Sequence, residues 1–331
     1  MTDSSHALSK TVLGGDALKV SQLFDIRGWV AIVTGGGTGL GLVTAAALAA
    51  NGAKVYITGR RLEPLQEAAV NAAPKEGGGE LIPIQADAST KEGIQKMRET
   101  IESKEKFVNV LINNHGVSFG HADPNAVDQT PEALAKEMFD NETFDNWLNA
   151  YQINTASYYF TSFAFLPLLA AAKTIGGFPE PGNILNLGSV SGMTKTSQKG
   201  QFSYNANKAA TISLSHQLAT EFARRNLNVR VNVICPGYFP SGMNAMEEQH
   251  LGDSNHDYVR KRWGTPLGRA GNAVDYAQCI FSLIANQYIT GAELVIDGGW
   301  LLVQGESYRS TSHQIETPNL WLTFTKKHIA F

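Results

Sequence analysis

Tyr204 and Lys208 stand four residues apart, a spacing that places both side chains on one face of a helix, one turn apart. A tyrosine hydroxyl titrates near about 10, so it exchanges protons slowly at neutral pH unless a nearby ammonium stabilises the phenolate. Lys208 could supply that charge by lowering the pKa of Tyr204. The pair therefore predicts acid–base chemistry, although an exposed tyrosine and lysine on a helix is the simpler explanation of the pair alone.

The composition favours a soluble protein with an ordinary buried core. The chain has 331 residues, of which 43% are hydrophobic, and a net charge of -3, so neither nucleic acid nor a membrane is an expected partner. Its two cysteines, Cys235 and Cys279, are too few for a disulfide framework or a structural zinc site. Residues 1–25 lack an apolar leader, and no apolar run approaches membrane-spanning length. We expect a cytoplasmic location.

Short apolar runs alternate with segments of helical periodicity from residue 30 onward, which is typical of β-α-β units. This pattern predicts the fold class α/β, with a single doubly wound Rossmann-type domain around a central parallel seven-stranded sheet. The domain would cover 27–300, between an N-terminal extension at 1–26 and a C-terminal tail at 301–331. The expected strands are 30–34, 53–58, 81–86, 108–112, 183–187, 229–234 and 293–296. The expected helices are 40–50, 62–70, 90–102, 144–172, 204–223 and 273–285.

A glycine-rich turn, 34–41, follows the first expected strand and precedes an alanine-rich helix. Glycines allow a tight turn and close backbone approach, and the helix N-terminus offers free N–H groups and a positive dipole to a pyrophosphate. This context predicts dinucleotide binding, against the alternative of an ordinary strand–helix connection.

The second expected strand runs into Gly59, Arg60 and Arg61, where a protein that binds NAD usually has an acidic residue for the ribose 2′-hydroxyl. A guanidinium can pair with a 2′-phosphate, whereas a carboxylate would repel it. The sequence therefore predicts NADP(H) as the cofactor. The alternative is a solvated arginine pair near a helix start.

Several motifs in order resemble the short-chain dehydrogenase/reductase family across residues 27–299. They are the turn ending at Gly39-Leu40-Gly41, Asn113-Asn114-His115-Gly116, Asn154, Ser189, the Tyr204 and Lys208 pair, the run 235–241, Pro266-Leu267-Gly268-Arg269 and the run 290–299. Their spacing is most similar to that of NADPH-dependent oxoacyl and polyketide-type ketoreductases. The resemblance implies an NADPH-dependent carbonyl reductase, or reversible alcohol dehydrogenase, that forms a homodimer or homotetramer. A non-catalytic NADP(H)-binding sensor or scaffold is the alternative.

The resemblance also implies a role for each site residue. Tyr204 would donate the proton, Ser189 would hydrogen-bond the substrate oxygen, Lys208 would hold the nicotinamide ribose, and Asn154 would position a water. The implied cofactor-binding residues are Gly35, Gly37, Thr38, Gly39, Leu40, Gly41, Arg60, Arg61, Asp87, Ala88, Asn114, Gly116, Tyr204, Lys208, Pro236, Gly237, Phe239 and Ser241. No metal site is expected.

The chain departs from the family pattern in three places. His115 replaces the family's alanine, and it could be a substrate or cofactor contact or a hydrogen-bonded structural histidine. Ser191, not Ser189, stands at the family's usual spacing from Tyr204, but we choose Ser189 because it directly follows the strand. Residues 118–144 form a longer segment than the family needs, expected to be a surface insertion near the site. Its six carboxylates have the spacing of a solvated acidic face, not of a metal site.

Substrate identity is the least determined feature. The expected substrate loop, 239–263, contains Met243, Met246, His250, His256, Tyr258 and Trp263. These side chains suggest an apolar or partly aromatic ketone, or equally the packing of the loop itself. The apolar tail at 301–331 should dock on a neighbouring subunit or on its own domain.

Overall fold

A seven-stranded parallel sheet forms the centre of the protein, in the order β3-β2-β1-β4-β5-β6-β7. The computed structural model describes residues 15–120, 122–241, 259–260 and 264–303. The predicted fold class, a single doubly wound α/β domain with this sheet, is confirmed. The six side chains expected to line the substrate loop, Met243, Met246, His250, His256, Tyr258 and Trp263, lie outside the described residues, as does the tail beyond 303.

The order of the strands reverses between β1 and β4, because β1 pairs with both β2 and β4. In open α/β sheets the ligand binds outside the carboxyl ends of the strands at such a point. β1 and β6 are buried along their whole length, as expected for strands covered on both faces. The strands are β1 Val30–Thr34, β2 Lys54–Gly59, β3 Glu80–Gln85, β4 Val110–Asn113, β5 Asn183–Leu187, β6 Arg230–Pro236 and β7 Glu293–Ile296.

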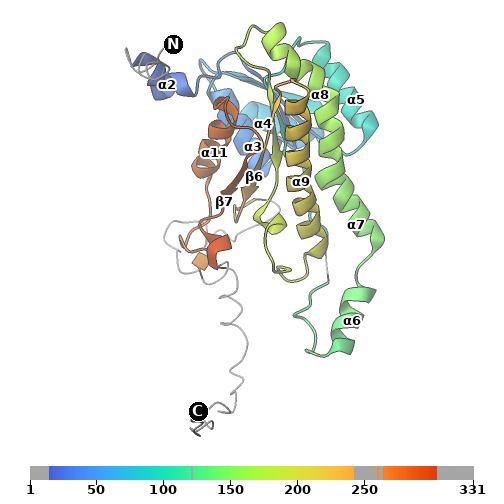
Figure 1. The fold of residues 1–331 in the computed structure, drawn as a ribbon. Helices are drawn as coiled ribbons and strands as arrows, with labels where there is room; N and C mark the ends of the chain where they lie inside the picture. Colours follow the sequence, from blue (N-terminus) through green and yellow to red (C-terminus); the bar gives the residue numbers. More distant parts are fainter. Residues whose placement is uncertain (1–14, 121, 242–258, 261–263, 304–331) are drawn as a thin grey trace, which may run out of the picture.

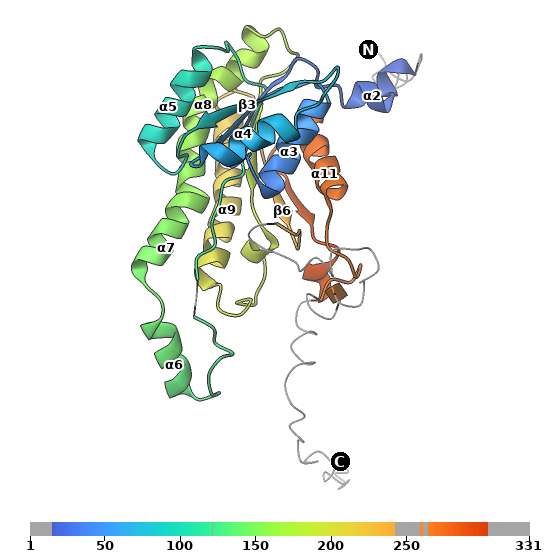
Figure 2. The same ribbon diagram turned by 180° about the vertical axis from the view of Figure 1, so that it is seen from behind.

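Helices cover both faces of the sheet, as Figures 1 and 2 show. One face carries α3 (Gly39–Ala50), α4 (Leu62–Asn71) and α11 (Ala273–Ala285) over an apolar cluster that includes Leu48, Leu65 and Ile280. The other face carries α5 (Lys91–Glu102), α8 (Ser157–Thr174) and α9 (Phe202–Arg224) over a second cluster that includes Met97, Phe165 and Phe222. Burial of these two apolar faces is the main stabilising contribution to the layered fold.

The helix expected at 144–172 is divided into α7 (Phe144–Tyr151), a π-helical turn (Gln152–Ala156) and α8. The whole segment is helical, as predicted, and the π-helical turn in its middle is a feature that the prediction did not include. Contacts from α9 hold the wide turn: Thr211 Oγ1 donates to the Asn154 carbonyl at 2.9 Å, and Thr155 Oγ1 donates to the Asn207 carbonyl at 2.9 Å. Single π-turns inside α-helices occur frequently at functional sites.

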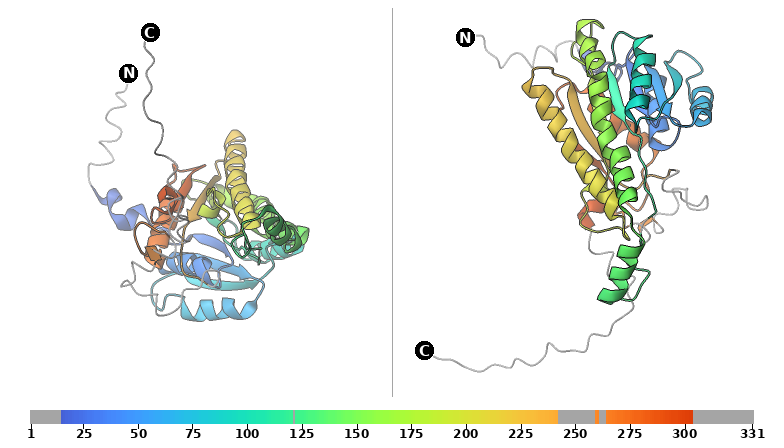
Figure 3. Two further views of the ribbon diagram at one scale, coloured as in Figure 1. Left: turned by 90° about the horizontal axis from the view of Figure 1, so that it is seen from below. Right: turned by 90° about the vertical axis from the view of Figure 1, so that its right-hand side faces the viewer.

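The insertion contains a helix that the sequence reading missed, α6 (Pro131–Asp140), which projects beyond the carboxyl edge of the sheet (Figure 3). Thr130 caps it by accepting a hydrogen bond from the Ala133 N–H at 3.2 Å, and Pro131 occupies its first turn. A threonine cap followed by proline is a helix-start signal that could have revealed it.

In the described part of the N-terminal extension, residues 15–23 are exposed, and only the segment from Phe24 onward packs against the domain. A short turn at Asp16–Leu18 and α2 (Val20–Leu23) lead to Phe24, whose ring meets Phe281 of α11 edge-on at 6.4 Å, and to Ile26, which is fully buried. Short 3₁₀ turns also occur at Val190–Gly192 and Trp300–Val303. The boundary predicted at residue 26 stays a prediction.

One helical stretch, Phe144–Thr174, is long and apolar enough to cross a membrane by length and composition. Of its most apolar window, 56% is buried within the fold. Core helices of soluble proteins meet the same criterion, so the stretch is a weak sign of a membrane span.

Candidate active site

Tyr204 and Lys208 lie in the first turns of α9, at the carboxyl edge of the sheet, as their spacing predicts. The Lys208 Nζ lies 5.8 Å from the centroid of the Tyr204 ring and donates a hydrogen bond to the Leu187 carbonyl at 2.8 Å. Leu187 ends β5, so this bond fixes the ammonium at the strand end. Lys208 is 2% exposed, whereas Tyr204 is only half-buried and can meet a substrate.

Ser189 is the serine that contacts the tyrosine. Its hydroxyl is near enough to the Tyr204 phenol to lower the pKa of that phenol, and it accepts a hydrogen bond from the Ser191 N–H at 3.1 Å. Ser191 lies in the following 3₁₀ turn and is buried. Both serines are buried, and the choice of Ser189 over Ser191 stays a prediction.

The expected effect of Lys208 on Tyr204 is not found in the structure. Burial raises the pKa of Tyr204 to about 12, and the hydrogen bond with Ser189 only partly opposes this shift. Burial also lowers the pKa of Lys208 to about 8. The spacing of the two residues predicted a lowered pKa for Tyr204, but desolvation penalises the charged form of each group and dominates both shifts. Tyr204 is therefore protonated at neutral pH, which is the form that a proton donor requires.

Asn154 lies in the π-helical turn and ties it to the segment after β4. Its Oδ1 accepts from the Val117 N–H at 2.8 Å, and its Nδ2 donates to the Val117 carbonyl at 2.9 Å. A side chain at Gly116 would place its Cβ 2.9 Å from Asn154 Oδ1, so glycine is needed for this approach. The amide is engaged with backbone, and its expected role in positioning a water stays a prediction.

His115 bridges two hydroxyls at the ends of β1 and α8. Its Nδ1 lies 2.8 Å from Thr34 Oγ1, its Nε2 lies 2.8 Å from Ser157 Oγ, and Tyr158 donates to its carbonyl at 2.7 Å. Burial, together with the charge of Lys208, lowers the pKa of His115 to about 3, so the ring is neutral. Of the two interpretations that the sequence left open, the geometry favours the hydrogen-bonded structural histidine.

The glycine turn has the shape needed to hold a pyrophosphate. Gly35 and Gly39 have φ of 66° and 55°, and a Cβ at Gly41 would lie 2.2 Å from the Gly35 carbonyl oxygen. Asn114 Nδ2 donates to the Thr34 carbonyl at 2.9 Å, while its buried Oδ1 has no hydrogen-bond partner among the described residues. Thr38 precedes α3, whose first N–H groups lack intrahelical partners. The glycine turn, the N-terminus of α3 and the free Asn114 Oδ1 together fit a dinucleotide.

The residues expected to bind the adenosine end gather beside this turn. Arg60 and Arg61 follow β2 and are exposed, and Gln85 of β3 donates to the Arg60 carbonyl at 2.9 Å. Asp87 accepts from the Ser89 N–H at 2.9 Å, and Ala88 beside it is buried. Burial disfavours the ionised Asp87, but hydrogen bonds from Ser89 and the charge of Arg60 outweigh it and lower the pKa of the carboxyl. Gly37 packs against Leu65, where a Cβ would lie 3.1 Å from that side chain.

The segment after β6 lies beside the glycine turn at 34–41. Pro236 ends β6, and Gly237 lies so close to Asp297 that a Cβ would be 2.7 Å from the Asp297 Cα. Phe239 is buried and packs edge-on against Tyr276 at 5.6 Å. A Cβ at Gly39 would lie 3.6 Å from the Ser241 Cβ, so Ser241 lies beside the helix start. Leu40 packs against the apolar cluster to which Phe239 and Tyr276 belong.

A pocket beside Tyr204 contains residues that the sequence reading missed. Its walls come from the segment after β4, from the junction of α6 and α7, and from the start of α9. Glu142, Asn146, Gln201 and Ser203 supply its polar groups. The only sequence signal for them was the position of the insertion ahead of Asn154.

Comparisons with known proteins agree with this geometry. A family model described as short chain dehydrogenase matches residues 29–252. The short-chain dehydrogenase/reductase VdtF of Byssochlamys spectabilis is 34% identical over 318 residues, covering 89% of this chain and all (100%) of that protein. The rhamnolipids biosynthesis 3-oxoacyl-(acyl-carrier-protein) reductase of Pseudomonas aeruginosa is 30% identical, covering 84% of this chain and 98% of that protein. The solved Pseudomonas aeruginosa RhlG/NADP active-site complex is similar with a TM-score of 0.69 and 28% identity, over 84% of this chain and 98% of that chain. The chain therefore belongs to the short-chain dehydrogenase/reductase family.

Proposed function

We propose that the protein is an NADPH-dependent carbonyl reductase, able to run in reverse as an alcohol dehydrogenase. The observation that carries this proposal is the half-buried Tyr204, whose pKa is affected by Ser189 and which lies one turn from Lys208. The three side chains lie at the carboxyl edge of the sheet, where a nucleotide would meet the substrate. Membership of an oxidoreductase family with ketoreductase relatives supports the same reaction class.

NADPH, when bound at the glycine turn, would supply a hydride for the carbonyl carbon. Tyr204 donates its proton to the oxygen as negative charge develops there, which its raised pKa permits because the phenol is protonated at neutral pH. Ser189 donates a hydrogen bond to the same oxygen and stabilises that charge. The Lys208 ammonium, fixed by the Leu187 carbonyl, holds the nicotinamide ribose. Asn154 would position a water for the return of a proton to Tyr204.

A preference for NADP(H) is supported by Arg60 and Arg61, which are exposed where an acidic residue would otherwise face the ribose. The solved Pseudomonas aeruginosa RhlG/NADP complex, a structural neighbour, supports the same preference. The test is a comparison of kcat/KM for NADPH and NADH in the wild-type protein and in Arg60→Ala. We expect a preference for NADPH that falls in the variant, and equal values for the two cofactors in the wild type would refute the proposal.

The alternative is a non-catalytic NADP(H)-binding sensor or scaffold. Oxidation of NADPH with a panel of apolar and aromatic ketones separates the two functions. Reduction of a ketone supports the enzyme, whereas NADPH binding without oxidation across the whole panel supports the sensor.

We also propose self-association through a stripe of apolar and aromatic side chains on α7 and α8. The stripe is formed by Phe144, Leu148, Tyr151, Tyr159 and Phe163. These side chains are exposed by 39 to 86%, an unusual amount of apolar surface along one pair of helices. Leu148→Glu should lower the mass measured by light scattering, while Val70→Glu, at a more exposed apolar site on α4, should leave it unchanged. A monomeric wild-type protein would contradict this proposal.

A cytoplasmic location is likewise proposed. It is supported by Cys235 and Cys279, which are both free, as is usual in a reducing compartment. Fluorescence imaging of the tagged full chain tests it, and secretion or accumulation in an organelle would contradict it.

A further inference from the structure

The pocket beside Tyr204 is small, and both apolar and polar residues line it. Its volume is about 20 Å³, room for about one water-sized group. Val117 and Phe119 form an apolar wall, whereas Asn146, Gln201 and Ser203 supply neutral polar groups and Glu142 supplies a carboxylate. Because Tyr204 lines the same pocket, whatever enters it lies next to the carbonyl that Tyr204 would protonate.

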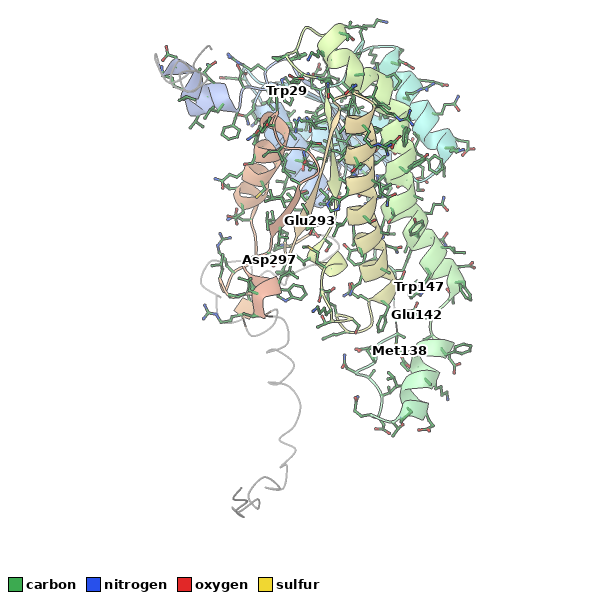
Figure 4. All side chains as sticks on the ribbon, viewed as in Figure 1. Trp29, Met138, Glu142, Trp147, Glu293 and Asp297 are labelled. Atoms are coloured by element: carbon green, nitrogen blue, oxygen red, sulfur yellow. The ribbon has the colours of Figure 1, made fainter. Side chains whose placement is uncertain are left out.

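Glu142 is held in place by hydrogen bonds from one residue before it and one residue after it in the chain. Its Oε1 accepts from the Ala122 N–H at 3.1 Å, and its Oε2 accepts from Trp147 Nε1 at 3.1 Å. Figure 4 labels Glu142 and Trp147 at the junction of α6 and α7. A carboxylate offers about four lone-pair directions, so each oxygen keeps acceptor capacity after these bonds. The insertion thus presents a fixed hydrogen-bond acceptor to the pocket.

We propose that the substrate is a hydroxyketone, whose hydroxyl group enters this pocket and donates a hydrogen bond to Glu142 while the ketone meets Tyr204. This inference rests on the proposed carbonyl reductase function and names its substrate class. A hydroxyl has the size of the pocket, and an O–H donor to a carboxylate forms a short, strong bond. An anionic group in that position would be repelled by Glu142. The neutral side chains of Asn146, Gln201 and Ser203 suit a hydroxyl better than a cation.

The test uses matched pairs of ketones that differ only by a hydroxyl near the carbonyl, with the wild-type protein and Glu142→Gln. We expect the wild type to prefer the hydroxylated ketone in kcat/KM by about 10- to 100-fold, the usual effect of a hydrogen bond to a charged group. Glu142→Gln should lose most of this preference. Glu137→Gln is the matched control, because Glu137 also accepts a backbone N–H in the insertion, from Asp123, but does not line the pocket.

Three results would overturn the inference. The first is that the wild type shows no preference for the hydroxylated ketone. The second is an equal loss of kcat/KM for both ketones in Glu142→Gln, because Glu142 would then have only a structural role, and the third is a stronger preference for an aminoketone. Calorimetric binding of the same pairs to Tyr204→Phe with NADPH makes the test independent of turnover. A binding preference in this variant, together with no ketone reduction by the wild type, would refute the proposed function but support the pocket assignment. Ketone reduction by the wild type without a binding preference would do the reverse.

Discussion

Replacing Lys208 with methionine should make the stability of the protein less dependent on pH. Burial lowers the pKa of Lys208 from 10.5 to about 8, so the folded state holds this proton less tightly than the unfolded state. One pKa unit corresponds to about 1.4 kcal/mol, so the charged lysine costs the folded state about 3 kcal/mol below pH 8. Between pH 8 and 10.5 the unfolded state binds more protons, and the wild-type free energy of unfolding should rise by that amount relative to the variant.

The assay is urea unfolding of both proteins without cofactor at several pH values from about 7 to 10.5. The variant also loses the hydrogen bond to the Leu187 carbonyl, but that loss adds a constant that does not change with pH. The difference between the two proteins should therefore shift by about 3 kcal/mol in favour of the wild type as the pH rises. A difference that is independent of pH, or that moves the other way, would refute the assignment of Lys208 as a destabilising buried charge.

Three further predictions concern the same site. Ser189→Ala should lower kcat by about 100-fold or more, the usual cost of losing an oxyanion donor, while Ser191→Ala keeps most activity; the reverse order in steady-state kinetics would make Ser191 the catalytic serine. Gly41→Ala should weaken NADPH binding and destabilise the fold by about 1–3 kcal/mol, because the new Cβ would collide with the Gly35 carbonyl, whereas Gly59→Ala meets only ordinary contacts; equal unfolding midpoints would contradict this. Finally, kcat/KM for ketone reduction should fall as the pH rises above about 8, where Lys208 loses its charge, while Tyr204 stays protonated; a flat profile up to about pH 10 would count against a role for the ammonium.

The sheet could be predicted because most of its strands, β1 and β6 above all, are buried on both faces and read as continuous apolar runs. The bounds of β1, β5 and β7 agree with the sequence reading residue for residue. The π-helical turn could not be predicted, because it depends on hydrogen bonds between Thr155 and α9 that leave no periodic signal. α6 is a different case, because its threonine cap was visible in the sequence but the acidic composition suggested only a surface segment.

The candidate site was predicted as a set of residues, but its electrostatics were not. The spacing of Tyr204 and Lys208 gave their common face, yet it carried no information on burial, and burial decides both pKa shifts. His115 shows the same limit, because its partners Thr34 and Ser157 come from distant parts of the chain. The carboxylate of Glu142 could not be distinguished from its acidic neighbours until the fold placed it beside Tyr204.

The central claim, that Tyr204 is the proton donor of an NADPH-dependent carbonyl reductase, is tested most directly with the Tyr204→Phe variant. Ketone reduction is followed by NADPH absorbance, and NADPH binding is measured by calorimetry on the same sample. The account predicts that turnover falls by at least about 100-fold while the Kd for NADPH changes little, because only the phenol is removed. Undiminished turnover in Tyr204→Phe would contradict it.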